Sequence, residues 1–429
     1  MRPKQKNIST PLAEQTYNIV DLDCGIRVLH FPHPSQVTHC GFLIDVGSRD
    51  EQADEMGMAH FIEHMFFKGT EKRKGLQVLN CLEYVGGEMN AYTTKDKTAL
   101  YASVNKDYFK KAADLLFDMV FKPSFPEVEI IKEVKVIQEE IDMYQDSPEE
   151  NIIDLFQEYA FPYNSLGYNI LGSHETLNTF NQEKVIRFYK PKYIPQKMVF
   201  FYNGNIKALD CIRTLQKLSN KYVSQQANTS YQRKELELNT YMPFNKTIQT
   251  KHVQSYLMIG GLAYNNHDNR RLSASLLFNI LGGPTLNSKL NLLIREKYAF
   301  AYDVEASYQS LPDIGLFHFY VGTDKKYLDK TRQLIINELK SLKDNRLSSL
   351  SLNRYKNQFK GQLLLSEENR ISVSLTESKM LLDGRKIETM QHVFHQVEAI
   401  ESSELCAIAN ELFEEKNLSQ LLFEEQGTK

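Results

Sequence analysis

Apolar positions along the chain recur with two spacings, one typical of strands and one typical of helices. Short apolar runs bounded by glycine and polar residues predict strands at residues 26–31, 41–46 and 98–104. Apolar residues three and four positions apart predict helices at residues 76–85 and 107–121. This mixture of strands and helices indicates an α+β fold.

The pattern restarts in the second part of the chain. Residues 222–250 are rich in Gln, Asn, Lys and Thr, and we expect them to connect two domains. The elements predicted after them are strands at 256–260, 301–307 and 316–321 and helices at 271–281, 288–297, 326–342, 350–365, 369–382 and 402–413. Their order echoes the first part, which indicates an internal repeat. We therefore expect two related domains, residues 1–225 and 226–429.

Composition and charge narrow the class of protein. Of the 429 residues, 42% are hydrophobic and 24% are charged, as in soluble globular proteins, and the net charge of −3 argues against a nucleic-acid partner. No apolar run approaches roughly eighteen residues and residues 1–23 lack an apolar signal core, so we expect a cytoplasmic protein without a membrane span. The five cysteines show no Cys-x-x-Cys spacing, which favours free thiols.

An apolar helix predicted at residues 58–67 contains the candidate catalytic chemistry. His60 and His64 are one helical turn apart, so both imidazoles project from one face and can supply two ligands of a zinc site. Glu63 lies beside His64 and is a candidate general base for an attacking water. Ionisable groups on so apolar a helix are costly unless they are paired or bind a metal, which favours a metal site over a chance match.

A later helix, predicted at residues 128–144, offers a third ligand. Glu133 and Glu140 are seven residues apart and share one face at the edge of the apolar stripe, whereas Glu139 points about 100° away. We therefore expect Glu140 to complete the metal site and Glu133 to orient a histidine from behind. The alternative interpretation of this helix is a solvated acidic face.

Together these stretches resemble the zinc peptidases with the inverted motif, a family that includes pitrilysin, insulin-degrading enzyme and the mitochondrial processing peptidase. The resemblance rests on HFIEHMFFKGT at residues 60–70 and EVKVIQEEI at residues 133–141, and it is strongest to the processing-peptidase branch. It implies one Zn²⁺ per chain, bound by His60, His64 and Glu140. It also implies that Glu63 is the base and that Glu133 matches an acid behind the ligands.

Residues 86–94, with the sequence GGEMNAYTT, are expected to form a hairpin with the next strand or a free edge strand. In the resembled family, a Gly-Gly-x-x-Asn-Ala-x-Thr stretch lies beside the zinc and pairs with an extended peptide. The resemblance thus implies that Asn90, Ala91, Tyr92 and Thr93 bind substrate.

A second motif lies in the C-terminal part, which lacks His-x-x-Glu-His and is therefore expected to bind substrate or support the site. Gly282-Gly283 followed by residues 295–302, REKYAFAY, resembles the family's second substrate motif. The resemblance implies that Arg295 and Tyr302 contact peptide carbonyls near the zinc, where a guanidinium and a phenol stabilise a developing oxyanion. Without the resemblance, an exposed helix end beside a packed tyrosine is the ordinary interpretation.

The predicted function is that of a zinc metalloendopeptidase that cleaves peptides or unfolded, presequence-like segments. The resemblance implies two related α+β halves, each a mostly antiparallel sheet covered by helices, arranged as a clamshell around a closed chamber. It also implies a homodimer. Two alternatives are a heterodimer with a zinc-less paralogue and a non-catalytic peptide-binding subunit of a larger complex.

Overall fold

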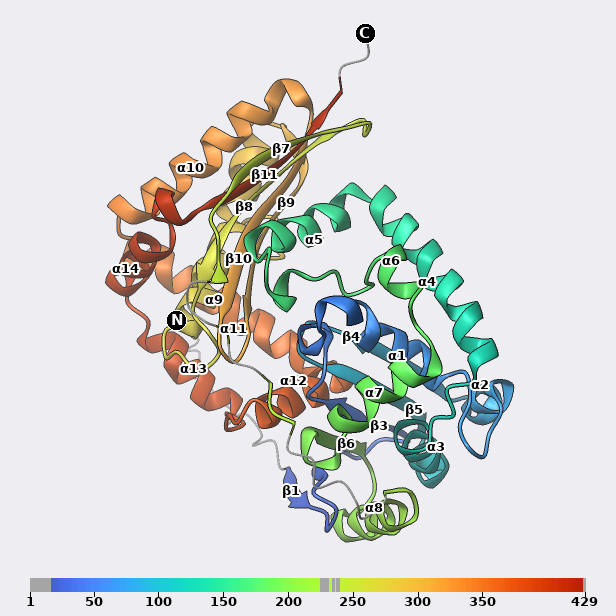
Figure 1. The fold of residues 1–429 in the computed structure, drawn as a ribbon. Helices are drawn as coiled ribbons and strands as arrows, with labels where there is room; N and C mark the ends of the chain where they lie inside the picture. Colours follow the sequence, from blue (N-terminus) through green and yellow to red (C-terminus); the bar gives the residue numbers. More distant parts are fainter. Residues whose placement is uncertain (1–16, 224–230, 234–235, 237–239, 427–429) are drawn as a thin grey trace, which may run out of the picture.

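The structure, a computed structural model, describes residues 17–223, 231–233, 236 and 240–426. Within these residues, the strands form a six-stranded sheet in the N-terminal half and a five-stranded sheet in the C-terminal half (Figure 1). The predicted boundary between residues 225 and 226 lies outside the described residues.

The N-terminal half alternates strands and helices, as the apolar pattern predicts. Its strands are β1 (Asn18–Asp21), β2 (Arg27–Pro32), β3 (Val37–Ile44), β4 (Glu88–Thr93), β5 (Thr98–Asn105) and β6 (Met198–Gly204). Its helices are α1 (Met58–Phe66), α2 (Gly75–Glu83), α3 (Phe109–Phe121), α4 (Glu127–Asp146), α5 (Pro148–Ala160), α6 (His174–Leu177), α7 (Gln182–Lys192) and α8 (Ala208–Tyr222).

The C-terminal half repeats this plan. Its strands are β7 (Asn245–Thr250), β8 (Ser255–Ala263), β9 (Ala301–Ser310), β10 (Gly315–Thr323) and β11 (Ser419–Glu425). Its helices are α9 (Arg271–Gly282), the π-helical segment η7 (Asn291–Lys297), α10 (Leu328–Asp344), α11 (Ser349–Glu367), α12 (Arg370–Leu382), α13 (Met390–Ala399) and α14 (Ser402–Leu412).

Strand order shows that the two halves are related. The first sheet runs β2-β6-β3-β5-β4, with β1 added beside β2, and the second runs β7-β11-β8-β10-β9. In both, the last strand lies between the first and the second, and the third strand forms an edge. Each sheet has one parallel pair, β2 with β6 and β7 with β11, and its other pairs are antiparallel. The expectation of two related, mostly antiparallel halves is therefore confirmed.

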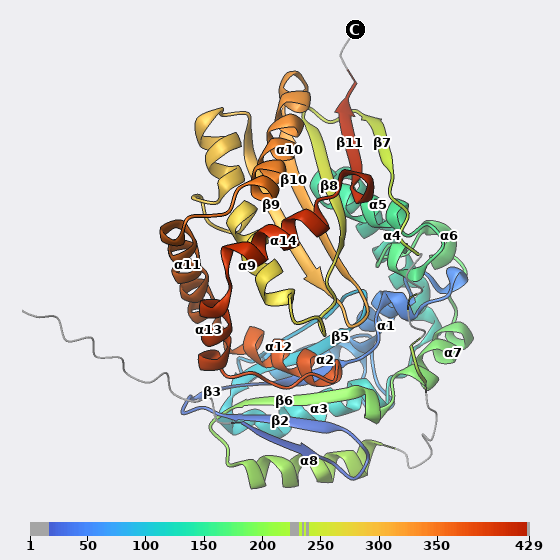
Figure 2. The same cartoon turned by 90° about the vertical axis from the view of Figure 1, so that its left-hand side faces the viewer.

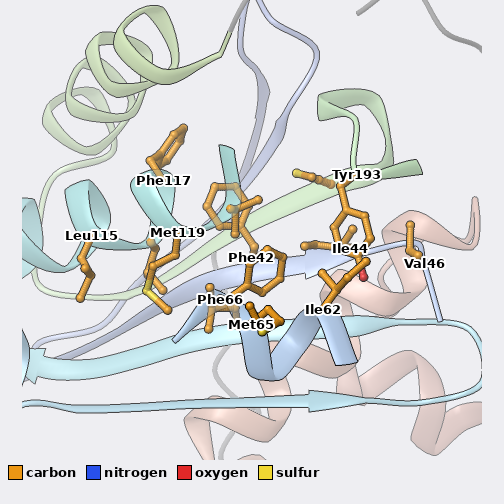
Figure 3. Packing of buried hydrophobic residues seen from close by; sticks show 14 of the residues in the cluster. Phe42, Ile44, Val46, Ile62, Met65, Phe66, Leu115, Phe117, Met119 and Tyr193 are labelled. Carbon is orange, nitrogen blue, oxygen red and sulfur yellow. The ribbon is translucent and has the colours of Figure 1, made fainter. Parts of the chain in front are cut away.

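The main core of the N-terminal half lies between its sheet and helices α1 and α3. Phe42 and Ile44 of β3 point to the same side because side chains alternate along a strand, and they pack with Met65 of α1 and Phe117 of α3 (Figure 3). The apolar residues of α1 are fully buried. The apolar character of α1 thus reflects its place inside the domain, where its ionisable residues are unusual.

In each half, one helix packs on the sheet of the other half. Helix α5 packs through Ile152 and Phe156 on the second sheet, against residues of β8, β10 and β11 (Figure 1). Helix α12 packs through Leu381 on the first sheet, against residues of β2 and β6 (Figure 2). Because α5 and α12 occupy matching places in the two halves, this exchange follows the internal repeat.

One expectation from the sequence is wrong. Residues 245–250 were expected to belong to the connection between the domains, but they form the edge strand β7. Ile248 is the only apolar residue of β7, which is largely exposed, so its sequence lacks the alternation of a half-buried strand. Among the described residues, no helix is both long and apolar enough to cross a membrane.

Candidate metal centre and active site

Helix α1 is held at its N-terminus by a buried carboxylate. Glu51 accepts hydrogen bonds from the backbone N–H groups of Gly57 at 2.9 Å and Ala59 at 2.8 Å. A carboxylate is favoured there because the first N–H groups of a helix lack partners within it. Gly57 has φ 92°, and a Cβ would lie 2.7 Å from Leu171 O, so only glycine fits this start. These contacts fix the helix that carries the histidines.

The structure brings together the three predicted metal ligands. His60 and His64 project from one face of α1 towards Glu140 of α4, and one ligand atom from each residue lies within 4.8 Å of the others. His60 Nε2 is 4.0 Å from Glu140 Oε1, and His64 Nε2 is 3.8 Å from Glu140 Oε2. Two imidazole nitrogens and one carboxylate oxygen form a donor set typical of catalytic zinc sites.

The protonation state of His60 suits a metal ligand. Burial, together with the nearby charge of His64, lowers the pKa of His60 to about 3, so its imidazole is neutral and able to act as a ligand. Burial raises the pKa of Glu140. Two imidazoles and a half-buried carboxyl group thus lie together, partly shielded from bulk water. A bound divalent cation would stabilise this arrangement of polar groups.

Behind the ligands, Glu133 orients His64. His64 Nδ1 lies 2.8 Å from Glu133 Oε1, and Lys68 Nζ lies 2.6 Å from Glu133 Oε2. Burial alone would raise the pKa of Glu133, but these two partners lower it, so Glu133 stays charged. Burial alone would lower the pKa of His64, but its bond to Glu133 raises it. With Nδ1 engaged, Nε2 is the nitrogen that faces Glu140.

Glu63 lies on the same helix and is held by the edge strand. Its Oε2 accepts a hydrogen bond from Thr93 Oγ1 of β4 at 2.6 Å. Glu63 is 8% exposed, and burial raises its pKa, although the Thr93 bond opposes that shift. A buried carboxylate with a raised pKa suits a group that takes up a proton during a reaction.

The predicted substrate strand is an edge of the sheet. Within the described residues, β4 pairs only with β5, so its other side is open for hydrogen bonding. Asn90 is exposed, whereas Ala91, Tyr92 and Thr93 are half-buried. Because Thr93 contacts Glu63, a peptide paired with β4 would run beside the metal ligands.

Arg295 and Tyr302 lie together in the half of the chain that lacks the metal ligands. The Arg295 guanidinium is 4.6 Å from the centre of the Tyr302 ring, and Tyr302 is 80% exposed. Arg49 of the N-terminal half binds Asp313 in the β9–β10 turn at 2.6 Å, whereas Tyr302 lies at the opposite end of β9. At about 3.3 Å per residue, β9 separates these ends by roughly 25–30 Å. Within the described residues of one chain, neither side chain bonds to the metal-site residues.

Three contacts of the site were missed in the sequence. Lys68 follows His64 by four residues, just beyond the end of α1, a spacing that places it near any partner of His64. The hydrogen bond from the Thr93 hydroxyl to Glu63 depends on how distant segments pack, as do the bonds from the start of α1 to Glu51. No local sequence pattern predicts these contacts.

Comparisons with known proteins find relatives among zinc proteases and peptidases. The family model for insulinase, peptidase family M16, matches residues 28–174, and the model for the peptidase M16 inactive domain matches residues 179–359. An uncharacterized zinc protease of Bacillus subtilis is 31% identical over 398 residues, 91% of this chain and 94% of that protein. A probable mitochondrial-processing peptidase subunit beta of Arabidopsis thaliana is 28% identical over 94% of this chain and 77% of its own length.

A solved structure supports the fold. The crystal structure of a peptidase M16 inactive domain from Pseudomonas fluorescens superposes with a TM-score of 0.87 at 15% identity, covering 96% of this chain and 99% of that one. The two family models follow one another along the chain, the second beginning at residue 179 within the N-terminal half, and the Bacillus relative matches nearly the whole chain. The chain therefore belongs to peptidase family M16, the insulinase family.

Proposed function

We propose that the protein is a zinc-dependent metalloendopeptidase with one catalytic Zn²⁺ per chain. The observation that supports this best is the convergence of His60, His64 and Glu140 beside a buried Glu63. Zn²⁺ in such a site polarises a carbonyl and lowers the pKa of water. Peptide hydrolysis needs these effects together with a proton acceptor.

The residues of the chain have separate roles in the proposed reaction. Glu63 accepts the proton of the attacking water and passes it to the leaving amine, a transfer that its raised pKa favours. Glu133 holds the ring of His64 in the orientation needed for binding. Thr93 fixes the carboxylate of Glu63 relative to strand β4.

We infer that the substrate is an extended peptide or an unfolded, presequence-like segment. An edge strand binds such a chain through backbone hydrogen bonds at Asn90, Ala91, Tyr92 and Thr93, and a tightly folded protein offers no free strand to pair with it. The Arabidopsis relative, named as a processing-peptidase subunit, agrees with this substrate class.

We further propose a homodimer that closes a chamber around the substrate. Arg295 and Tyr302 are suited to bind peptide carbonyls, but they lie at the far end of β9 from the turn that meets the N-terminal half. A second copy facing the first would bring its own Arg295 and Tyr302 to the metal site. A heterodimer with a zinc-less paralogue needs the same geometry. A non-catalytic peptide-binding role is less well supported, because the ligands and Glu63 are all retained.

Zinc analysis and peptide cleavage on the same preparations test the proposed function. The wild-type protein should contain about one zinc per chain and cleave a mixture of unstructured peptides. Glu63→Gln should keep its zinc and lose about 10²–10⁴ in rate, because the amide cannot accept the proton. His64→Ala should lose both zinc and activity. Cleavage by Glu63→Gln at the wild-type rate would remove Glu63 from the mechanism.

A further inference from the structure

The turn between β4 and β5 contains three consecutive buried charges. Lys95 is 6% exposed, Asp96 is 1% exposed and Lys97 is 2% exposed. Hairpin turns usually lie at the surface, and a buried charge is costly unless it is paired. The partners of this turn therefore show what is packed over it.

Lys97 is surrounded by carboxylates from both halves of the chain. Its Nζ lies 3.0 Å from Asp45 Oδ1, 2.9 Å from Asp96 Oδ2 and 2.9 Å from Asp383 Oδ1. Asp383 directly follows α12, and its other oxygen accepts a hydrogen bond from Asn266 Nδ2 at 2.8 Å. Burial alone would lower the pKa of Lys97, but the carboxylates raise it, so the ammonium is charged. The C-terminal half thus reaches the turn through one carboxylate.

Arg233, from the segment between the halves, contacts the same group of residues. Arg233 binds Asp45 Oδ1 at 3.0 Å and Asp50 Oδ2 at 2.7 Å, and it donates to the backbone oxygen of Asp96 at 2.9 Å. Lys379 of α12 lies 3.9 Å from Asp96. The β4–β5 turn is therefore tied to the connecting segment and to α12 as well as to its own domain.

The turn is rigidly joined to the strand that holds Glu63. The backbone N–H of Thr94 donates to Lys97 O at 2.8 Å, and Thr94 Oγ1 donates to the same oxygen at 3.1 Å. Thr93, the preceding residue and the last of β4, donates to Glu63. A shift of Lys97 would therefore be transmitted through Thr94 to Thr93 and to the carboxylate of Glu63.

We propose that Lys97 is a positioning residue whose contact with Asp383 couples the docking of the C-terminal half to the placement of β4 and Glu63. The coupling rests on the proposed function for its catalytic consequence. Docking α12 on the first sheet brings Asp383 to Lys97, which fixes the turn and, through Thr93, the base. Misplacement of a catalytic group by about 1 Å can cost roughly 10²-fold in rate.

The variant Asp383→Asn tests this coupling. It removes the charge from the C-terminal half but leaves Lys97 with Asp45 and Asp96, so the ammonium stays neutralised and the fold should persist. Lys97→Met would instead remove the ammonium that Asp45, Asp96 and Asp383 share and is unsuitable. We expect Asp383→Asn to keep its zinc, to lose roughly 10- to 100-fold in kcat, and to show faster hydrogen exchange at residues 88–98.

Asp313→Asn is the matched control. It removes another ion pair between the halves, with Arg49, but its side chain does not touch Lys97. It should leave kcat and the exchange of residues 88–98 unchanged. If Asp383→Asn does not fold, Lys379→Met is the alternative variant. It removes the longer contact between α12 and Asp96, at 3.9 Å, and should give a smaller loss of kcat and a smaller rise in exchange at residues 88–98.

Exchange at residues 88–98 decides the coupling without reference to activity. Exchange in Asp383→Asn equal to that of the wild type, or an equal rise in Asp313→Asn, would overturn the proposal. If the wild type cleaves no peptide, the proposed function fails, whereas faster exchange confined to residues 88–98 would still support the link between Asp383 and β4.

Discussion

Thr93 Oγ1 lies 2.6 Å from Glu63 Oε2, so a side chain of the edge strand is bonded to the candidate general base. The strand that would bind the peptide and the carboxylate that would accept the proton are therefore positioned by one contact. A peptide that pairs with β4 would be placed relative to Glu63 as well as to the candidate metal ligands.

Removing the Thr93 hydroxyl should slow the reaction without loss of metal. A hydrogen bond to a charged group contributes about 1.5–3 kcal/mol, which corresponds to about 10- to 150-fold in rate if it is needed in the transition state. We expect Thr93→Val to lose activity in this range and to keep the wild-type zinc content. Thr93→Ser retains the donor and should recover most of the rate. Equal activity of Thr93→Val and the wild type in steady-state peptide cleavage would contradict this role.

Glu133 should control how tightly zinc is held. Carboxylates that orient a histidine ligand typically contribute 10- to 100-fold to metal affinity, and Glu133 also binds Lys68. We therefore expect Glu133→Gln to bind zinc about 10- to 100-fold more weakly in competition with a chelator. Glu139→Gln is the control, because Glu139 lies on the same helix but is exposed. Equal affinity in the two variants would show that Glu133 does not support the site.

Glu377 of α12 should make stability depend on pH. It is 8% exposed, and burial, followed by the charge of Glu367, raises its pKa from 4.5 to about 8. The folded chain keeps this proton up to about pH 8, whereas the unfolded chain loses it near pH 4.5. The unfolded state thus binds fewer protons in this window, and the free energy of unfolding falls as pH rises, by up to about 1.4 kcal/mol per pH unit.

The variant Glu377→Gln removes this titration. Its melting temperature should exceed that of the wild type at pH 8, and the gain should shrink towards pH 5. Glu368→Gln, a change at an exposed glutamate, should show no such trend. A constant difference between Glu377→Gln and the wild type across this range would show that Glu377 is charged in the folded protein.

Much of the candidate metal centre could be predicted because its geometry is local. His60, Glu63 and His64 lie within about one turn of α1, and Glu133 and Glu140 are two turns apart on one face of α4. The helical period alone places these side chains on shared faces and leaves Glu139 exposed. Only the packing of α1 against α4 had to come from the resemblance.

Contacts between the halves could not be predicted in the same way. Nothing in the apolar pattern of α12 says that Leu381 packs on the first sheet, and Asp383 looks like an ordinary turn residue beside Gly384. Strand β7 was not predicted because its sequence lacks the apolar alternation of a half-buried strand. Its backbone pairing with β11 stabilises it instead. Such contacts depend on the assembled halves, where backbone pairing and burial override local propensity.

Within the described residues, Tyr302 makes no contact with the metal ligands of its own chain, and this motivates the sharpest test of the proposed dimer. In a homodimer with shared sites, each site combines the ligands and Glu63 of one copy with Arg295 and Tyr302 of the other. The Glu63→Gln protein then lacks a base at both sites, and the Arg295→Ala, Tyr302→Phe double variant lacks the carbonyl contacts at both. Each protein alone should therefore be nearly inactive while keeping its zinc.

Mixed dimers of these two proteins should regain activity. Each mixed dimer contains one complete site, formed by the ligands of the double variant and by Arg295 and Tyr302 of the Glu63→Gln copy. Random pairing makes half of the dimers mixed, so co-expressed chains should recover about a quarter of the wild-type rate. If Arg295 and Tyr302 served the metal site of their own chain, or the chain acted as a monomer, the mixture would stay as inactive as its components. Size measurement of the purified chain would then separate the monomer from a dimer with independent sites.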